Sequence, residues 1–173
     1  MNKKNSVRRY LAIDLFVIIF LTALDQWTKA LASTHLKEAA DIILIPGVFQ
    51  LHYLENRGAA FGILQNQRLV FVILTLLYLA AAAWFFNRCP KNKKYFLLHL
   101  IASVLTAGAL GNFIDRLLLG YVVDFFYFSL INFPIFNVAD IFVVAAFIGI
   151  TASVLFLYKD EDFSFLSLKK KER

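Results

Sequence analysis

The stretch FNVADIFVVAAFIGITASVLFLY, residues 136–158, joins a polar start to a long apolar run. Asn137 and Asp140 stand near its beginning, and no charged residue follows Asp140 before Tyr158. About 20 mostly apolar residues are enough to cross the hydrocarbon core of a bilayer as an α-helix. The stretch therefore predicts a membrane-spanning helix with a carboxylate at its mouth.

The rest of the chain is equally apolar. Hydrophobic residues make up 60% of the 173 residues, and the mean hydropathy is +0.67, whereas soluble domains are about 45–50% apolar. Four segments match a spanning helix in length and composition, namely 11–31, 69–86, 95–118 and 138–158. We therefore expect an all-α integral membrane protein with four transmembrane helices, built as a single membrane domain over residues 1–173.

The basic residues orient these segments. Most of the 18 Lys and Arg residues lie in three places, which are the N-terminus, the link at 88–94 and a basic tail at 159–173. Positive charge marks the cytoplasmic side, so both termini are expected in the cytoplasm and the two longer connections outside. The net charge of +6 then faces anionic lipid headgroups. We expect membrane lipids as partners and no nucleic acid.

Two other interpretations of the chain are disfavoured. The N-terminus resembles a cleavable secretory signal, but its apolar part exceeds the usual 7–15 residues and contains Asp14 and Asp25. We therefore expect a retained first helix. A single cysteine, Cys89, and three scattered histidines give no recognisable ligand pattern for zinc. Neither a metal nor a cofactor is expected.

Polar residues gather near the outer ends of the expected helices. Asp25 and Lys29 are four residues apart on the first helix, and GALGNFIDR closes the third with Asn112, Asp115 and Arg116 on one face. An acid at membrane depth is costly and is by default a functional-site hypothesis. Structural roles are also open, because the Asp25–Lys29 pair can be self-neutralising and Gly108 and Gly111 can simply let helices approach closely.

Two acids stand out within this group. Asp140 fits a helix cap together with Asn137, but Asp124, in GYVVDFF, has neither a cap role nor an adjacent base. Two carboxylates that share a site hold one proton between them, which suits them to activate water and to protonate a leaving amine. A serine–lysine pair, Lys29 and Ser33, is a weaker hypothesis because Asp25 would keep the lysine charged. A proton or ion pathway and a non-catalytic assembly subunit remain as other functional classes.

The first outer connection contributes a different element. Apolar and polar residues alternate in FQLHYL, residues 49–54, which predicts a β-strand. Asn56 and Arg57 follow, and then a glycine-rich turn, GAAFG, at 58–62. Glycine allows close backbone approach, so this small β-containing segment can lie beside an extended peptide or turn back into the membrane.

Five motifs in this order resemble bacterial lipoprotein signal peptidase, or signal peptidase II: DQWTK at 25–29, NRGAAFG at 56–62, GALGNFIDR at 108–116, VVDF at 122–125 and FNVAD at 136–140. The resemblance implies an aspartic endopeptidase of the bacterial cytoplasmic membrane with four spanning helices and a small extracytoplasmic sheet. Its substrates would be diacylglyceryl-modified prolipoproteins, cut before the lipid-modified cysteine. The resemblance assigns catalysis to Asp124 and Asp140, near the outer face. Supporting and substrate-binding roles fall on Asn56, Gly58, Asn112, Arg116, Asn137, Asp25, Lys29 and Asp115.

Overall fold

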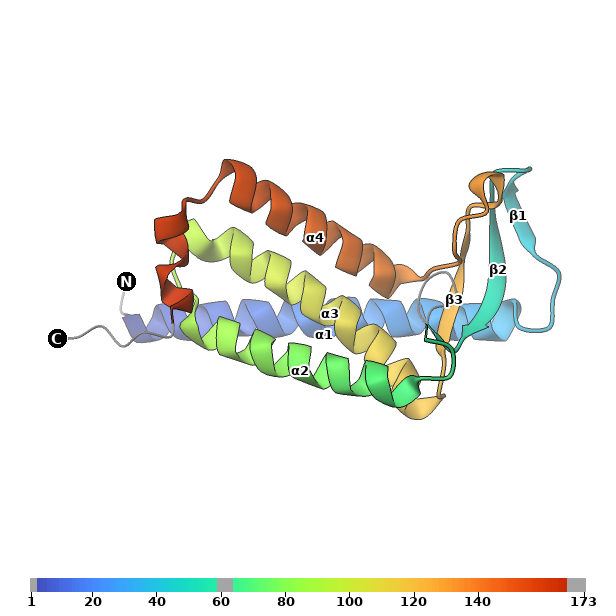
Figure 1. Ribbon diagram of the computed structural model, residues 1–173, viewed down its shortest axis with the longest axis horizontal. Helices are drawn as coiled ribbons and strands as arrows, with labels where there is room; N and C mark the ends of the chain where they lie inside the picture. Colours follow the sequence, from blue (N-terminus) through green and yellow to red (C-terminus); the bar gives the residue numbers. More distant parts are fainter. Residues whose placement is uncertain (1–2, 59–63, 168–173) are drawn as a thin grey trace.

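The structure is a computed structural model that describes residues 3–58 and 64–167. Four long helices run side by side along its longest axis (Figure 1). They are α1 (Lys3–His35), α2 (Arg68–Arg88), α3 (Phe96–Leu118) and α4 (Val138–Phe156). Each coincides with one of the expected spans, although α1 extends well beyond both ends of its predicted range. The prediction of a mostly helical protein is confirmed.

Three of these segments have the length and composition to cross a membrane: α2, the stretch Lys93–Leu118 that ends in α3, and α4. The first helix, α1, is 33 residues long, or about 50 Å at 1.5 Å per residue. Its buried side chains include Asp14, Asp25 and Lys29. All three side chains face α3, so buried polar groups form part of the interface between α1 and α3.

A three-stranded antiparallel sheet lies at the end of the bundle where α1 ends and α4 begins (Figure 1). Its strands are β1 (Ile42–Ile45), β2 (Phe49–Asn56) and β3 (Val122–Tyr127), in that order. The expected strand at 49–54 is therefore confirmed within β2. The sheet packs on the end of α1 through the buried side chains of Ala32, Leu36, Val123 and Phe125.

The strand register decides which residues of the sheet meet. Leu54 pairs with Asp124, and Asn56 pairs with Val122. Paired residues of neighbouring strands point to the same face, and alternate residues along one strand also share a face. Asn56 and Asp124 therefore project together from the sheet toward the helices, although 68 residues separate them in the chain.

The C-terminal segment differs from the expected basic tail. Residues Asp160–Leu166 form a short 3-10 helix, η4, that begins with three acidic residues. Asp162 pairs with Lys94 and accepts a 3.0 Å hydrogen bond from the Tyr95 hydroxyl through its carbonyl oxygen. The Phe165 ring packs against Phe85 and Tyr95. The tail thus folds back on the link between α2 and α3, while Lys169–Lys171 and Arg173, like 59–63 of the glycine-rich turn, lie outside the described residues.

Candidate active site

The start of α4 is a capping box, as the sequence predicts. The Asn137 side-chain oxygen accepts a 3.0 Å hydrogen bond from the Asp140 backbone N–H, and Asp140 Oδ2 accepts a 3.1 Å bond from the Asn137 N–H. This arrangement uses only one oxygen of the Asp140 carboxylate. The other oxygen, Oδ1, accepts a 2.8 Å hydrogen bond from Asn112 Nδ2. Capping therefore leaves Asp140 able to take part in a site.

The second acid, Asp124, projects from β3 and is 2% exposed. Asn56 Nδ2 donates to its Oδ2 at 2.8 Å, and Asn137 Nδ2 donates to its Oδ1 at 2.6 Å. Burial, aided by the negative charge of Asp140, raises the pKa of Asp124 to about 7, against the lowering effect of the two asparagine hydrogen bonds. A carboxyl group with this pKa can both hold and release a proton near neutral pH.

Two asparagines connect the acids. Asn137 is fully buried, and its Nδ2 lies 3.0 Å from Asn112 Oδ1 as well as 2.6 Å from Asp124. The Nδ2 group of Asn112 points toward Asp140 and donates a hydrogen bond to its carboxylate. Asp124 and Asp140 are thus held by one continuous set of neutral hydrogen-bond donors that comes from the sheet, α3 and the start of α4.

The predicted Asp25–Lys29 ion pair is confirmed, and it forms part of a larger buried polar cluster. Lys29 Nζ lies 2.9 Å from Asp25 Oδ2 and 3.1 Å from Asp115 Oδ2, and all three side chains are at most 3% exposed. Lys29 also donates to Asn112 Oδ1 at 2.9 Å. The remaining oxygen of Asp25 accepts the Ala139 N–H at 2.8 Å. The cluster therefore joins α1, α3 and the first turn of α4.

Asp115 and Gln26 complete this support. Gln26 was not predicted from the sequence. Gln26 Nε2 donates to Asp115 Oδ1 at 2.9 Å and to the Gly111 carbonyl at 3.1 Å. Asp115 Oδ2 also accepts the Val123 N–H at 3.1 Å, which fixes β3 beside Asp124. The spacing of Gln26 and Lys29, three residues apart, was the available signal, because it places both on one helix face. Gly111 is required here, since a Cβ at this position would collide with the Asp25 carboxylate.

Arg116 bonds to backbone groups rather than to a neighbouring acid. Within the described residues it forms no salt bridge to Asp115 or Asp124. Its guanidinium donates to the backbone carbonyl of Gly58 at 3.2 Å and lies 4.4 Å from the centre of the Phe71 ring. The reason is that Asp115 faces Lys29, whereas asparagine amides engage Asp124. Arg116 instead borders the site together with Gly58, whose N–H donates to Asn56 Oδ1 at 2.9 Å.

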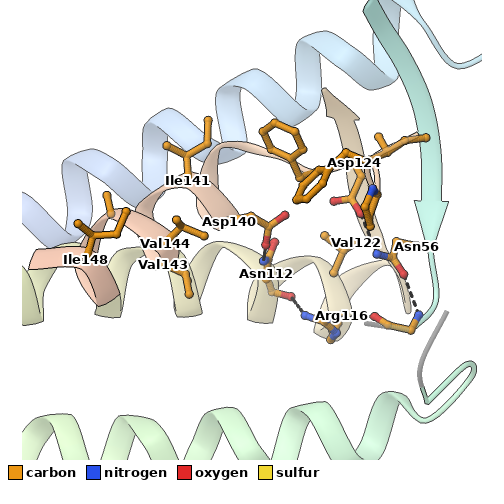
Figure 2. Close-up of a pocket in the computed structure, with 16 residues that line it drawn as sticks. Asn56, Asn112, Arg116, Val122, Asp124, Asp140, Ile141, Val143, Val144 and Ile148 are labelled. Carbon is orange, nitrogen blue, oxygen red and sulfur yellow. Dashed lines mark hydrogen bonds between the residues drawn. The ribbon is translucent and has the colours of Figure 1, made fainter. Parts of the chain in front are cut away.

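A cavity of about 670 Å³ unites these groups. Figure 2 shows Asp124 and Asp140 at its polar end, with Asn56, Asn112 and Arg116 around them. Its apolar side follows α4 through Ile141, Val144 and Ile148. Phe133 and Phe136 also line it. The site thus offers an acid pair for proton transfer beside a surface suited to hydrocarbon or to apolar side chains.

The alternative chemistries find little support among the described residues. No group of three or more potential metal ligands occurs within residues 3–58 and 64–167. Lys29 is occupied by two carboxylates and an amide oxygen, so it is poorly placed to act as a base for Ser33. Asp14 and His99 are bonded to each other at 2.8 Å in a buried contact, where they hold α1 against α3.

The comparisons with known proteins agree with this geometry. The family model described as Signal peptidase (SPase) II matches residues 17–156. Lipoprotein signal peptidases from Streptococcus thermophilus and Clostridioides difficile are 44% and 41% identical, covering 84% and 82% of this chain and 92% and 94% of the relatives. A solved bacterial membrane enzyme has a TM-score of 0.74 at 33% identity, covering 93% of this chain and 95% of its own. The chain therefore belongs to the signal peptidase II family, aspartic peptidases that cleave signal peptides from prolipoproteins.

Proposed function

We propose that the enzyme cuts diacylglyceryl-modified prolipoproteins just before the lipid-modified cysteine, with Asp124 and Asp140 as its catalytic pair. The observation that carries the assignment is the convergence of these two carboxylates, from β3 and α4, on one cavity. Asparagine amides hold both acids, and no metal or cofactor is required. The apolar side of the cavity along α4 suits a substrate whose signal helix and acyl chains both partition into the bilayer.

The proposed reaction uses one proton shared by the pair. One carboxyl group is ionised and takes a proton from the water that attacks the scissile carbonyl. The protonated partner stabilises the developing oxyanion. As the tetrahedral intermediate collapses, the C–N bond breaks and the departing nitrogen receives a proton from the pair. Because Asp124 and Asp140 interact, they titrate as a unit.

The surrounding residues position this pair. Lys29 and Asn137 both donate to Asn112 Oδ1, so the Asn112 amide must turn its Nδ2 toward Asp140. Arg116 borders the cavity and uses only part of its donor capacity on the Gly58 and Asn112 carbonyls. Its remaining N–H groups can bind substrate carbonyl groups. Asp25 and Asp115 act through Lys29 and through the backbone of α4 and β3.

We further infer a position in the bacterial cytoplasmic membrane with both termini in the cytoplasm and the acid pair near the outer face. The observation that supports this orientation is that the basic residues lie at one end of the bundle and the acid pair at the other. The N-terminal end of α1, which carries Arg8 and Arg9, and the link between α2 and α3, which carries the basic residues at 91–94, lie at the end of the bundle opposite the sheet (Figure 1). The packing of the sheet on α1 supports a single membrane domain over residues 1–173.

The decisive experiment compares two substrates with purified enzyme. A synthetic prolipoprotein carrying the diacylglyceryl group and the same peptide with an unmodified cysteine are incubated with wild-type protein, and the products are identified by mass spectrometry. We expect cleavage of the modified peptide immediately before the cysteine and little cleavage of the other. Equal cleavage of both peptides would contradict the lipid requirement, and full activity of Asp124→Asn would contradict the assigned pair.

A further inference from the structure

The residue before Asn56 has no role in the proposed mechanism, yet its surroundings are highly organised. Glu55 and Asn56 are successive residues of β2, so their side chains project from opposite faces of the sheet. They pair with Val123 and Val122 of β3, respectively. Asn56 therefore shares a face with Asp124, while Glu55 projects from the opposite face, which packs on the end of α1 through Val123 and Phe125.

Glu55 interacts with three separate segments on that face of the sheet. Its Oε1 lies 3.1 Å from Lys37 Nζ, just beyond the end of α1, and its Oε2 lies 3.4 Å from Arg57. Tyr121, immediately before β3, also interacts with Glu55 and contributes to lowering its pKa. The Arg57 guanidinium stacks over the Tyr121 ring at 5.3 Å. We call Glu55, Lys37, Arg57 and Tyr121 the outer clasp.

The protonation states favour these contacts at neutral pH. The hydrogen bond from Lys37 is the main reason why the pKa of Glu55 is lowered, so Glu55 is ionised. Burial is the main reason why the pKa of Tyr121 is raised to about 12, so its hydroxyl keeps its proton. The Glu55 carboxylate thus interacts with one residue just beyond the end of α1, one just beyond the end of β2 and one just before β3.

The same segments determine where the Asn56 amide points. Asn56 Oδ1 accepts the Gly58 N–H at 2.9 Å, so the orientation of its Nδ2 toward Asp124 depends on the turn at 56–58. Arg57 is the middle residue of that turn, and Glu55 holds it. Tyr121 and Lys37 fix the neighbouring strand and helix end to the same carboxylate.

We propose that Glu55 is a positioning residue for the peptidase reaction, which through the outer clasp holds the Asn56 amide on Asp124. The inference rests on the proposed function, in which Asp124 is half of the catalytic pair. Exposed salt bridges contribute little to stability, and the Glu55 and Lys37 side chains are 30% and 47% exposed. The effect of the clasp should therefore appear in catalysis, where small displacements of reacting groups are costly.

The test uses Glu55→Ala, the more conservative Glu55→Gln, and Asn56→Ala as a reference. Asp41→Asn is a matched control, because Asp41 is also an exposed acid beside the same sheet and binds His52 and Gln50 at 2.8 and 2.7 Å. For each purified protein, kcat and KM are measured from about pH 5 to pH 9 with the lipid-modified peptide, together with thermal unfolding.

We expect Glu55→Ala to lower kcat about threefold to tenfold with little change in KM, because an exposed charge network supports geometry only in part. Losing the Asn56 hydrogen bond removes an effect that lowers the pKa of Asp124. The limb of the pH profile that belongs to Asp124 should therefore move to higher pH, in the same direction as in Asn56→Ala. Glu55→Gln should be intermediate, since its amide oxygen still accepts hydrogen bonds, and Asp41→Asn should match wild type.

Two results would overturn the proposal. One is a wild-type kcat and pH profile for Glu55→Ala when Asn56→Ala is impaired. The other is a lower unfolding temperature for Glu55→Ala with an unchanged kcat per folded molecule, which would make the clasp purely structural. Substantial turnover by Asp124→Asn would instead refute the assigned pair, so the two failures are distinguishable.

Discussion

Replacing Asp140 by asparagine separates a helix cap from a catalytic acid. An asparagine at this position has one oxygen and one amide nitrogen, whereas the Asp140 carboxylate accepts from both the Asn137 N–H and Asn112 Nδ2. One of these two hydrogen bonds must be lost, whichever way the new amide turns. The capping bond from the Asp140 N–H to the Asn137 side chain is unaffected, because it involves only the backbone of residue 140.

The structural cost of this change is accordingly limited to one donor that loses its acceptor. That loss is worth about 1–3 kcal/mol, and Asp140 is only half-buried. If Asp140 were merely a cap, Asp140→Asn would fold and turn over almost normally. If it belongs to a proton-sharing pair, the substitution removes general acid–base catalysis, worth about 10²–10⁴-fold in rate.

The assay is the initial rate of cleavage of a diacylglyceryl-modified prolipoprotein by purified Asp140→Asn, Asp124→Asn and the double variant, with folded protein quantified. Both single variants should lose at least about 100-fold in rate. The double variant should be hardly slower than either, because residues that act as a unit are strongly non-additive. A rate for Asp140→Asn within a few-fold of wild type would refute the reasoning and leave Asp140 as a cap.

Two further predictions concern the buried acids Asp25 and Asp124, and a third concerns the orientation in the membrane. Asp25→Ala should lower the free energy of unfolding by about 1–3 kcal/mol, because the Ala139 N–H loses its acceptor; denaturation equal to wild type would contradict this. The raised pKa of Asp124 means that the folded state binds more protons than the unfolded state between about pH 4 and pH 7, so stability falls as pH rises through that window. Asp124→Asn should therefore raise the unfolding temperature more at pH 8 than at pH 5, and an equal effect at both would count against a buried, titrating Asp124. With Cys89 removed, a cysteine at position 169 should resist membrane-impermeant labelling in intact cells, and labelling from outside would reverse the inferred orientation.

The helices and the polar contacts within single helices could be predicted from local patterns. The apolar runs locate four helices, the spacing of Asp25 and Lys29 gives their pairing, and the sequence of Asn137 and Asp140 gives the capping box. Each of these depends on residues within one helical turn or on a single apolar segment. The distribution of Lys and Arg also predicts which end of the bundle is basic and which end carries Asp124 and Asp140.

The remaining features depend on contacts between distant segments. The apolar residues around Asp124 do not reveal that it lies on β3, because its partner strand is β2, far away in the chain. Arg116 could not be assigned either, since its acceptor, the Gly58 carbonyl, is a backbone group. Gln26 carries no charge, so the positions of acids and bases in the sequence did not predict its role in the site. The three acidic residues that begin η4 were not distinguished from the basic residues that follow them, so the sequence predicted only a basic tail.

The placement of the cations fits the proposal that Asp124 and Asp140 share a proton. A lysine or arginine bonded directly to a carboxylate favours its ionised form, and two such pairings would leave no protonated partner. Here Lys29 is bonded to Asp25 and Asp115, and Arg116 donates to backbone carbonyls. Asp124 and Asp140 receive side-chain hydrogen bonds from asparagine amides, which satisfy a buried carboxylate without adding a positive charge. The supporting charges thus fix the geometry of the site without contacting the two acids directly, as the proposed sharing of a proton requires.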